Sequence, residues 1–446
     1  MNTPIADFVK NYTKSNFSRL HMPGHKGVSL IGCESLDITE IKGADELYSP
    51  SGIIRESESN ASKLFNTERT VYSAGGSSQS INAMLYLAFL RAEKKDRPFV
   101  LAGRNAHKSF IYALAKLDCD VEWIYPQNEH GICRCTVTAD VLRKRLKELE
   151  HMPFAVYITS PDYLGGIADI AGLSAVCGEY NIPLLVDNAH GAYLAFTEEK
   201  NHPILMSADM CCDSAHKTLP VLTGGGYLHI AKGDKYGFSK DAVRATEIFG
   251  STSPSYLILQ SLDLCNRYID EKICEEIKFC RKKCDEIRLV MKEKGISDIS
   301  DEPLKITADL RGFTPPLGGF SEYFRSCGIE PEYGDGDFAV FMVSPFNYTA
   351  DFEKLKEAFR NLNFEAKARS EPMILQTAKR AMTVREAVFS QCETVKAENS
   401  LGRICASPTV SCPPAVPIAV SGEVINENHI ILFKHYKTDN ISVVQE

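Results

Sequence analysis

The sequence lacks any run of about 18 apolar residues, so no segment is long enough to cross a bilayer as a helix. It also lacks an apolar signal core at its start, where MNTPIADFVKNYTKS carries an acidic residue early. Basic residues do not dominate: 50 Lys and Arg stand against 58 Asp and Glu, giving a net charge of −8. The longest basic clusters are short and helix-like, such as RKRLK at 143–147. These absences argue against membrane insertion, secretion and nucleic-acid binding, and we expect a cytoplasmic protein.

Metal-site spacing is missing as well. The 15 cysteines are scattered, and the pairs Cys133/Cys135 and Cys280/Cys284 do not form a CxxC…CxxC pattern. We therefore predict no metal site, and we expect free thiols in a reducing compartment. The GxxxxGK[ST] pattern of a Walker loop is also absent, and we find no internal repeat.

What is present is an alternation of short apolar runs with helix-period segments, beginning near residue 70. With 446 residues, 44% of them apolar and 24% charged, the chain is long enough for more than one globular lobe. Such alternation indicates βαβ units and a mostly parallel, seven-stranded type of sheet covered by helices, an α/β fold. The predicted strands are PFVLAG (98–103), VEWIYP (121–126), FAVYITSP (154–161) and IPLLVDNAH (182–190), with helices over 107–117, 138–150 and 169–181.

A second, smaller α/β lobe is predicted after about residue 300. The stretch 255–295 has long helical character with a break within it, and it links the two lobes. Apolar and helical segments then alternate again, as in LKITADL and DFEKLKEAFRNL. The tail has a Pro-rich centre, ASPTVSCPPAVPIAV, and ends in segments that read as strands.

Polar residues that could bind a ligand or take part in catalysis follow several of the predicted strands. Gly75, Gly76, Ser77 and Ser78 stand just before a helical run, where backbone N–H groups and hydroxyls can bind a phosphate. A Gly/Ser turn with a helix cap explains the same residues equally well. Because ligands of open parallel sheets bind at the carboxyl ends of the strands, the position favours a site without proving one.

Three further residues are ambiguous one at a time. Asp187 ends the apolar strand LLVD, and such a carboxylate is a functional acid, one half of a structural ion pair or a helix N-cap. His107 begins a helix, where a histidine is more often a packing or capping residue than a catalyst. Lys217 follows the apolar run MCCD in CCDSAHKTLP, although most lysines are simply solvated.

Together these residues match the needs of pyridoxal phosphate. Its phosphate requires helix N–H groups and hydroxyls, and its pyridinium nitrogen requires a carboxylate that keeps it protonated. Its aldehyde requires a lysine amine for a Schiff base. On this interpretation Lys217 joins the cofactor covalently.

Several longer motifs resemble the Orn/Lys/Arg decarboxylases, pyridoxal-phosphate enzymes of the aspartate aminotransferase superfamily (fold type I). LHMPGHKG (20–27) and DITEIKGADELYSPSGII (37–54) are similar to the family's N-terminal segments. SAHKTLPVLTGGG and STSPSYLILQSLD resemble its lysine and downstream motifs, and TVREAVFSQCETVKAENSLGRICA its C-terminal domain. The resemblance covers nearly the whole chain. It implies an N-terminal segment (1–60) that contributes to the active site and dimer, a cofactor-binding large domain (61–300) and a C-terminal small domain (301–446).

The resemblance also implies roles for individual residues. Lys217 would form the Schiff base, Asp187 would pair with the pyridinium nitrogen, and His107 would stack on the ring; Lys217 and His107 are candidate proton donors. His190 would help to position Asp187. The phosphate would be surrounded by Gly76, Ser77, Ser78, Ser214 and His216, and by Ser251 and Thr252 of a neighbouring subunit in a homodimer or a higher oligomer. Candidate substrate residues are His25, Glu46, Tyr48 and Glu423.

The tail departs from the family pattern. CPPAVP and VSGE place Cys412, Ala415 and Ser421 where the family has other residues, whereas Glu423 is retained. The chain also lacks the N-terminal receiver-like domain of the long family members and is expected to be a short form. The expected reaction is decarboxylation of a basic L-amino acid, with the choice among arginine, lysine and ornithine open. A transaminase, a Cα–Cβ lyase and a non-catalytic protein with the same fold remain alternatives.

Overall fold

The computed structural model describes residues 1–93, 97–126, 131–409 and 415–445; Cys412 of the altered tail lies outside these ranges. The chain divides into two compact units, and each unit consists of two separate stretches of sequence. The first unit holds residues 1–92 and 177–275, and the second holds 93–176 and 276–446. The linear domain boundaries at residues 60 and 300 stay a prediction.

A seven-stranded sheet in the order β1-β7-β6-β5-β4-β2-β3 confirms the predicted α/β class. The pairs β5–β6, β2–β3 and β2–β4 are parallel, whereas β7 runs antiparallel to both β1 and β6. The central strands are buried along their whole length, as expected for the continuous apolar runs of parallel strands. The strands are β1 (Thr67–Ser73), β2 (Phe99–Gly103), β3 (Asp120–Ile124), β4 (Ala155–Thr159), β5 (Leu184–Asp187), β6 (Met210–Asp213) and β7 (Gly226–Ala231).

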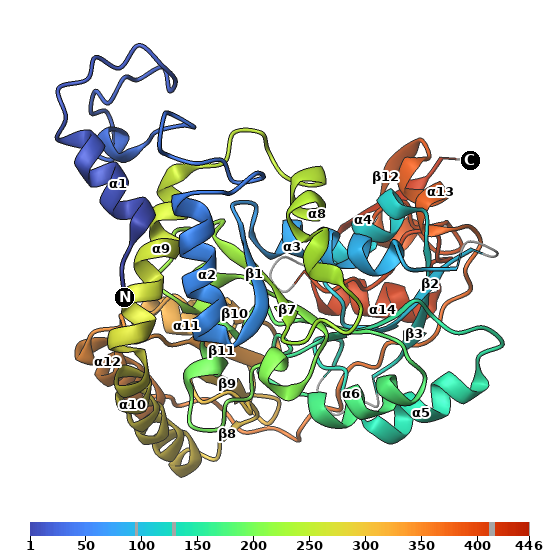
Figure 1. Cartoon of the computed structure of the whole chain (residues 1–446). Coiled ribbons are helices and arrows are strands. Elements are labelled where there is room, and N and C mark those ends of the chain that lie inside the picture. Colours follow the sequence, from blue (N-terminus) through green and yellow to red (C-terminus); the bar gives the residue numbers. More distant parts are fainter. Residues whose placement is uncertain (94–96, 127–130, 410–414, 446) are drawn as a thin grey trace. The chain divides into compact units, whose positions relative to one another are not determined.

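In the first unit, α3 (Gly76–Phe89) packs across β1, β7, β6 and β5. Ten of the 14 residues of α3 are buried, among them the polar Gln79, Ser80 and Asn82. Helix α2 (Ile53–Phe65) contacts β1 and α9 (Tyr256–Glu271), as Figure 1 shows. The remaining elements are α1 (Pro4–Thr13), η1 (Glu34–Leu36), η2 (Ala192–Phe196), η3 (Pro203–Met206), α7 (Ala215–Thr218), η4 (Phe238–Lys240) and α8 (Ala242–Ile248).

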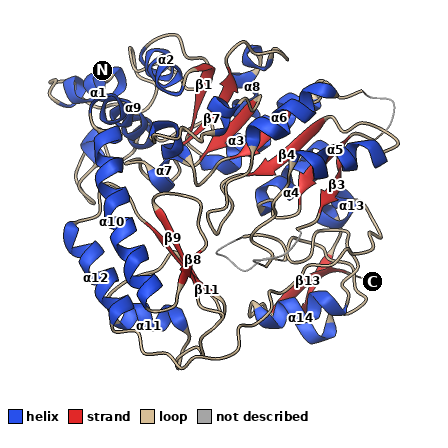
Figure 2. Ribbon diagram, turned by 90° about the horizontal axis from the view of Figure 1, so that it is seen from below, coloured by secondary structure: helices blue, strands red, loops and turns tan. Residues whose placement is uncertain are grey.

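In the second unit, a four-stranded antiparallel sheet has the order β10-β11-β9-β8. Helices α10, α11 and α12 lie on the same side of this sheet in Figure 2. This confirms the second α/β lobe predicted after residue 300. Its elements are α10 (Ile273–Glu293), β8 (Ser297–Asp298), β9 (Lys305–Asp309), α11 (Phe320–Ser326), β10 (Tyr333–Gly334), β11 (Phe338–Met342) and α12 (Thr349–Arg360).

The break predicted within 255–295 falls at Lys272, between α9 and α10. The tail was predicted to end in strands, and its described end contains one strand, β13 (Asn440–Val444), preceded by a helix that was not predicted. The partner of β13 is β12 (Cys392–Lys396), which precedes the Pro-rich centre and was not predicted either. The remaining helices of the described residues are α4 (Lys108–Leu117), α5 (Ala139–Glu148), α6 (Ile170–Glu179), α13 (Val384–Phe389), η5 (Ala397–Asn399) and α14 (Glu427–His435). Within the described ranges, no helix combines the length and the apolar character that a membrane crossing requires.

Candidate active site

The start of α3 carries the predicted phosphate-binding residues. Ser77 is half-buried and Ser78 is exposed in the first turn of this helix. The hydroxyl of Ser214, which follows β6, donates to the hydroxyl of Ser77 at 2.7 Å. Two hydroxyls from different elements therefore meet at a helix N-terminus, an arrangement suited to an anion.

Two glycines allow the backbone segments of this site to approach each other. Gly76 has φ +67°, a conformation that favours glycine, and its N–H donates to the carbonyl of Gly224 at 2.7 Å. A Cβ at Gly226 would lie 2.7 Å from the carbonyl oxygen of Asp213 and 3.3 Å from the nitrogen of Ser77. Any larger residue at 226 would push the end of β6 away from the first turn of α3.

Gln79 organises this turn and was not predicted as a site residue. Its Oε1 accepts from the N–H of Gly75 at 3.0 Å, and its Nε2 donates to the hydroxyl of Tyr48 at 3.1 Å and to the carbonyl of Thr246 at 2.7 Å. Burial raises the pKa of Tyr48, which keeps its hydroxyl protonated. Gln79 thus connects the predicted substrate residue Tyr48 to the candidate phosphate site.

Lys217 lies in the single helical turn α7. Its side chain is half-buried, and its Nζ lies 2.9 Å from Nε2 of His190. The adjacent His216 donates from Nδ1 to the carbonyl of Gly225 at 3.0 Å. Burial lowers the pKa of His216, and the charge of Lys217 adds to this effect, so His216 is neutral at neutral pH.

Asp187 ends β5 and is 2% exposed. Its Oδ1 accepts from the N–H of Ala189 at 3.2 Å and from the thiol of Cys212 at 3.6 Å. Burial raises the pKa of Cys212, and the charge of Asp187 raises it further, so the thiol remains a donor. A buried strand-end carboxylate and a half-buried lysine amine are thus both present in the first unit.

The other predicted residues of this unit make only local contacts or are exposed. The Nε2 of His25 lies 3.3 Å from Asp37, and its Nδ1 accepts from the N–H of Gly27 at 2.9 Å, both within its own segment. Glu46, Ser251 and Thr252 are exposed. Their roles in the site stay predictions.

His107 and Glu423 belong to the second unit. His107 caps α4, since its Nδ1 accepts from the N–H of Ser109 at 3.1 Å. This is the capping role that the sequence left open.

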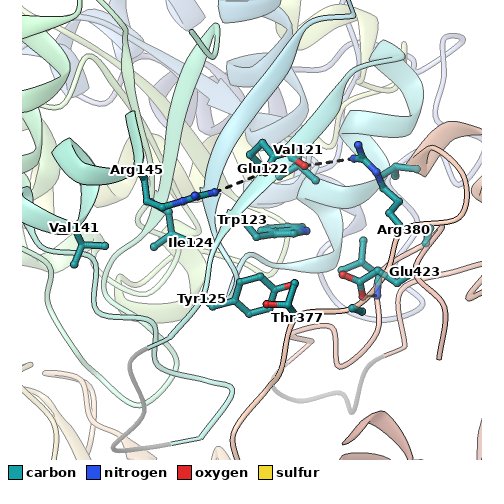
Figure 3. Close-up of a pocket in the computed structure, with 14 residues that line it drawn as sticks. Val121, Glu122, Trp123, Ile124, Tyr125, Val141, Arg145, Thr377, Arg380 and Glu423 are labelled. Atoms are coloured by element: carbon teal, nitrogen blue, oxygen red, sulfur yellow. Dashed lines mark hydrogen bonds and ion pairs between the residues drawn. The ribbon is translucent and has the colours of Figure 1, made fainter. Parts of the chain in front are cut away.

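Glu423 lines a cavity of about 730 Å³ beside β3, together with Trp123, Tyr125 and Arg380 (Figure 3). Its carboxylate accepts from the N–H of Val420 at 2.7 Å and from Arg104 at 3.3 Å. Arg104, 2% exposed, also donates to the carbonyls of Pro417 and Ile418. Glu423 is therefore part of a buried ion pair that fixes the tail segment 417–423.

One group of the described residues has the side chains of a metal site: His202, Cys211 and Asp213 place one ligand atom each within 4.8 Å of one another. Hydrogen bonds account for the two polar members, because Asp213 accepts from His202 at 3.0 Å. Burial raises the pKa of Cys211 well above its usual value, which disfavours the thiolate that a metal would need. The group is explained as a hydrogen-bond network.

Residues 3–300 match the family model of the Orn/Lys/Arg decarboxylase major domain, and residues 363–439 match that of the C-terminal domain. A Bacillus subtilis protein named arginine decarboxylase is 26% identical over 97% of this chain and 93% of its own length. Two solved structures share the fold: the Francisella novicida lysine decarboxylase (15% identity, TM-score 0.79, covering 99% of this chain and 81% of that one) and the Escherichia coli constitutive lysine decarboxylase (17%, 0.76, 100% and 82%).

Proposed function

The chain belongs to the Orn/Lys/Arg decarboxylase family, and from this premise we propose that it removes the α-carboxylate of a basic L-amino acid with pyridoxal phosphate as cofactor. The observation that carries the proposal is the site of the first unit. There the amine of Lys217 lies 2.9 Å from His190, and a hydroxyl pair marks the start of α3.

The donor set fits this cofactor. Lys217 would hold its aldehyde carbon and Asp187 its ring nitrogen; Ser77, Ser78, Ser214 and His216 would hold its phosphate, with the N–H groups of α3. When bound, the cofactor supplies a sink for the electron pair that the departing carboxylate leaves behind. For His107 we propose the role that the resemblance implies, a ring stacked on the cofactor.

The chain's own residues would control protons and orientation. A charged Asp187 favours a protonated ring nitrogen, because a nearby negative charge stabilises the positive form. His190 orients the amine of Lys217 through their short contact and can exchange a proton with it. Lys217 is then the proposed donor of the proton that replaces the lost carboxylate on the substrate's Cα.

For the substrate we propose arginine first, with agmatine as product. Support comes from the relative named arginine decarboxylase, which is similar along almost its whole length. A guanidinium also differs from an ammonium in offering a planar, bidentate donor set, so a pocket built for one would discriminate against the other.

Product analysis tests the proposal. The purified chain with pyridoxal phosphate is given arginine, lysine and ornithine separately, and CO2 and amine are quantified. CO2 with an equal amount of agmatine from arginine alone supports it. CO2 from lysine or ornithine would keep the reaction and change the substrate, and no CO2 from any of them would reject decarboxylation of basic amino acids.

We also propose that the chain works as a homodimer. Supporting this, the N-terminal segment carries five large apolar side chains that are 70–92% exposed: Phe17, Leu20, Met22, Leu30 and Ile31. Exposed apolar side chains gathered on one short segment are typical of a surface that another protein covers. The exposed hydroxyls of Ser251 and Thr252 would then be available to a neighbouring subunit's phosphate site.

A further inference from the structure

Asp213, the last residue of β6, directly precedes Ser214 of the candidate site and is completely buried. Its Oδ2 accepts from Nε2 of His202 at 3.0 Å and from Nε2 of His229 at 3.1 Å. Its Oδ1 accepts from the side-chain amide of Asn188 at 2.7 Å. One carboxylate therefore receives three donors from three different segments of the first unit.

The proton positions in this network follow from its geometry. Both imidazoles face the carboxylate with Nε2, so Nε2 carries the hydrogen in each. Thr70 lies 2.8 Å from Nδ1 of His229 and donates to it. Burial alone would raise the pKa of Asp213, but the two imidazoles hold it below its ordinary value, whereas burial lowers the pKa of His229. The network thus centres on a charged carboxylate that accepts from both imidazoles.

Asn188 is the link between this network and the candidate catalytic residues. It follows Asp187 directly and precedes His190 by two positions. Its backbone N–H donates to the carbonyl of Cys212 at 3.0 Å, and its carbonyl accepts from the N–H of Gly191 at 2.8 Å. With its side-chain N–H held by Asp213, the residue at the centre of this turn is anchored through both its backbone and its side chain.

We propose that Asp213 is a positioning residue for the cofactor site, acting through Asn188 to fix the turn that carries Asp187 and His190. A carboxylate suits this task because its two oxygens can accept three hydrogen bonds at once, which a single neutral amide oxygen cannot do as well. The inference rests on the proposed function, since it takes cofactor binding to be the role of the turn that carries Asp187 and His190.

The first test is Asn188→Ala, which removes the link and leaves Asp213 bonded to both histidines. The dissociation constant for pyridoxal phosphate, measured by titrating cofactor-free protein, is expected to rise about tenfold, the effect of losing one hydrogen bond to a buried charge. The rate constant kcat is expected to fall while the KM for the amino acid changes by less than about twofold, because the substrate's own contacts remain.

A charge-swapped pair supplies a second test that does not depend on truncation. Asn188→Asp alone would place two carboxylates against each other and should bind the cofactor poorly. Adding Asp213→Asn restores the bond, because the amide introduced at position 213 can donate to the carboxylate introduced at position 188 while its oxygen still accepts from both histidines. The double variant should recover most of the cofactor affinity.

Thr70→Val is the matched control, because it removes the hydrogen bond at the far end of the network. This variant should lower the melting temperature and leave the cofactor affinity within about twofold.

The outcomes separate the two claims. If the parent chain binds pyridoxal phosphate and the Asn188 variants bind it equally well, the positioning role is wrong while the proposed function stands. Failure of the swap to recover affinity in folded protein would also overturn the positioning role. If the parent chain itself takes up no cofactor, the proposed function fails and this inference falls with it.

Discussion

The Nζ of Lys217 and the Nε2 of His190 lie 2.9 Å apart, although 27 positions separate them in the sequence. Lys217 is supplied by α7 after β6, and His190 by the turn after β5; these two strands are parallel neighbours. Their carboxyl ends consequently meet at one edge of the sheet, which is where open α/β sheets bind their ligands. The pairing thus follows directly from the topology.

Lys217→Ala is expected to lower kcat by more than about a thousandfold, because both the covalent attachment point and the proposed proton donor are lost. The far-ultraviolet circular dichroism should not change, since the side chain is only half-buried. CO2 release measures the rate. Lys240→Ala, an exposed lysine of the same unit, should retain parental activity. Parental turnover by Lys217→Ala would refute the assignment.

Asp187→Asn keeps the size of the side chain and removes its charge. We expect kcat to fall at least about a hundredfold, the usual scale for loss of one electrostatic contact in a site, with weak cofactor binding retained. The reason is that an uncharged neighbour no longer favours a protonated ring nitrogen. Steady-state kinetics and the absorbance spectrum of the bound cofactor measure the two effects. A rate close to that of the parent would contradict the role given to Asp187.

The sheet could be predicted because its strands are continuous apolar runs. Asp187 and Lys217 could be proposed as site residues because an ionisable side chain at or just after the end of an apolar strand is easy to recognise. Gln79 and Asp213 were not predicted as site residues; Gln79 stands among other polar residues in GSSQSIN, where no pattern distinguishes it. A signal for Asp213 does exist: it is an acid that ends the otherwise apolar strand segment MCCD. Its partners His202 and His229 are recognisable only once β7 is placed beside β6.

Glu423 illustrates a different limit. The family motif predicted Glu423 to be a substrate residue. In the structure its carboxylate accepts a hydrogen bond from Arg104, which lies 319 positions away in the sequence. No local pattern encodes a pair at that separation. A role in substrate binding would now have to coexist with this ion pair.

Glu423→Ala should therefore act on stability first. Removing one partner of a buried ion pair leaves the other charge uncompensated, which costs about 3–5 kcal/mol. We expect a clear fall in the urea midpoint of the second unit's unfolding transition. Glu398→Ala, at an exposed position, is the control and should unfold like the parent. An unchanged midpoint in Glu423→Ala would show that Arg104 finds other partners.

The proposed homodimer predicts that charges in the exposed apolar N-terminal segment will weaken association. Leu30 and Ile31 are 83% and 84% exposed, so replacing both with glutamate should not disturb the packing of one subunit. Sedimentation velocity should show a dimer for the parent and a shift toward monomer for the double variant, because burying two charges is costly. A parent that sediments as a monomer at all concentrations would reject the homodimer.

Glu58 gives the chain a predicted pH dependence of stability. It is fully buried in α2, and burial raises its pKa from 4.5 to about 7, although the N–H of Tyr72 and nearby arginines oppose the shift. The folded state therefore holds a proton that the unfolded state releases between these two values. The free energy of unfolding should fall as the pH rises from about 4.5 to about 7, by up to about 3 kcal/mol from this group.

Glu58→Gln isolates this effect, because glutamine resembles the protonated side chain in size and in hydrogen bonding. The variant should match the parent near pH 4.5 and exceed its stability at pH 8, where the parent must bury a charge or take up a proton. Urea unfolding at the two pH values measures both differences. Asp263, whose pKa burial raises to about 6, contributes in the same direction and remains in both proteins, so the comparison cancels it. Equal pH profiles for Glu58→Gln and the parent would show that Glu58 stays charged in the folded chain.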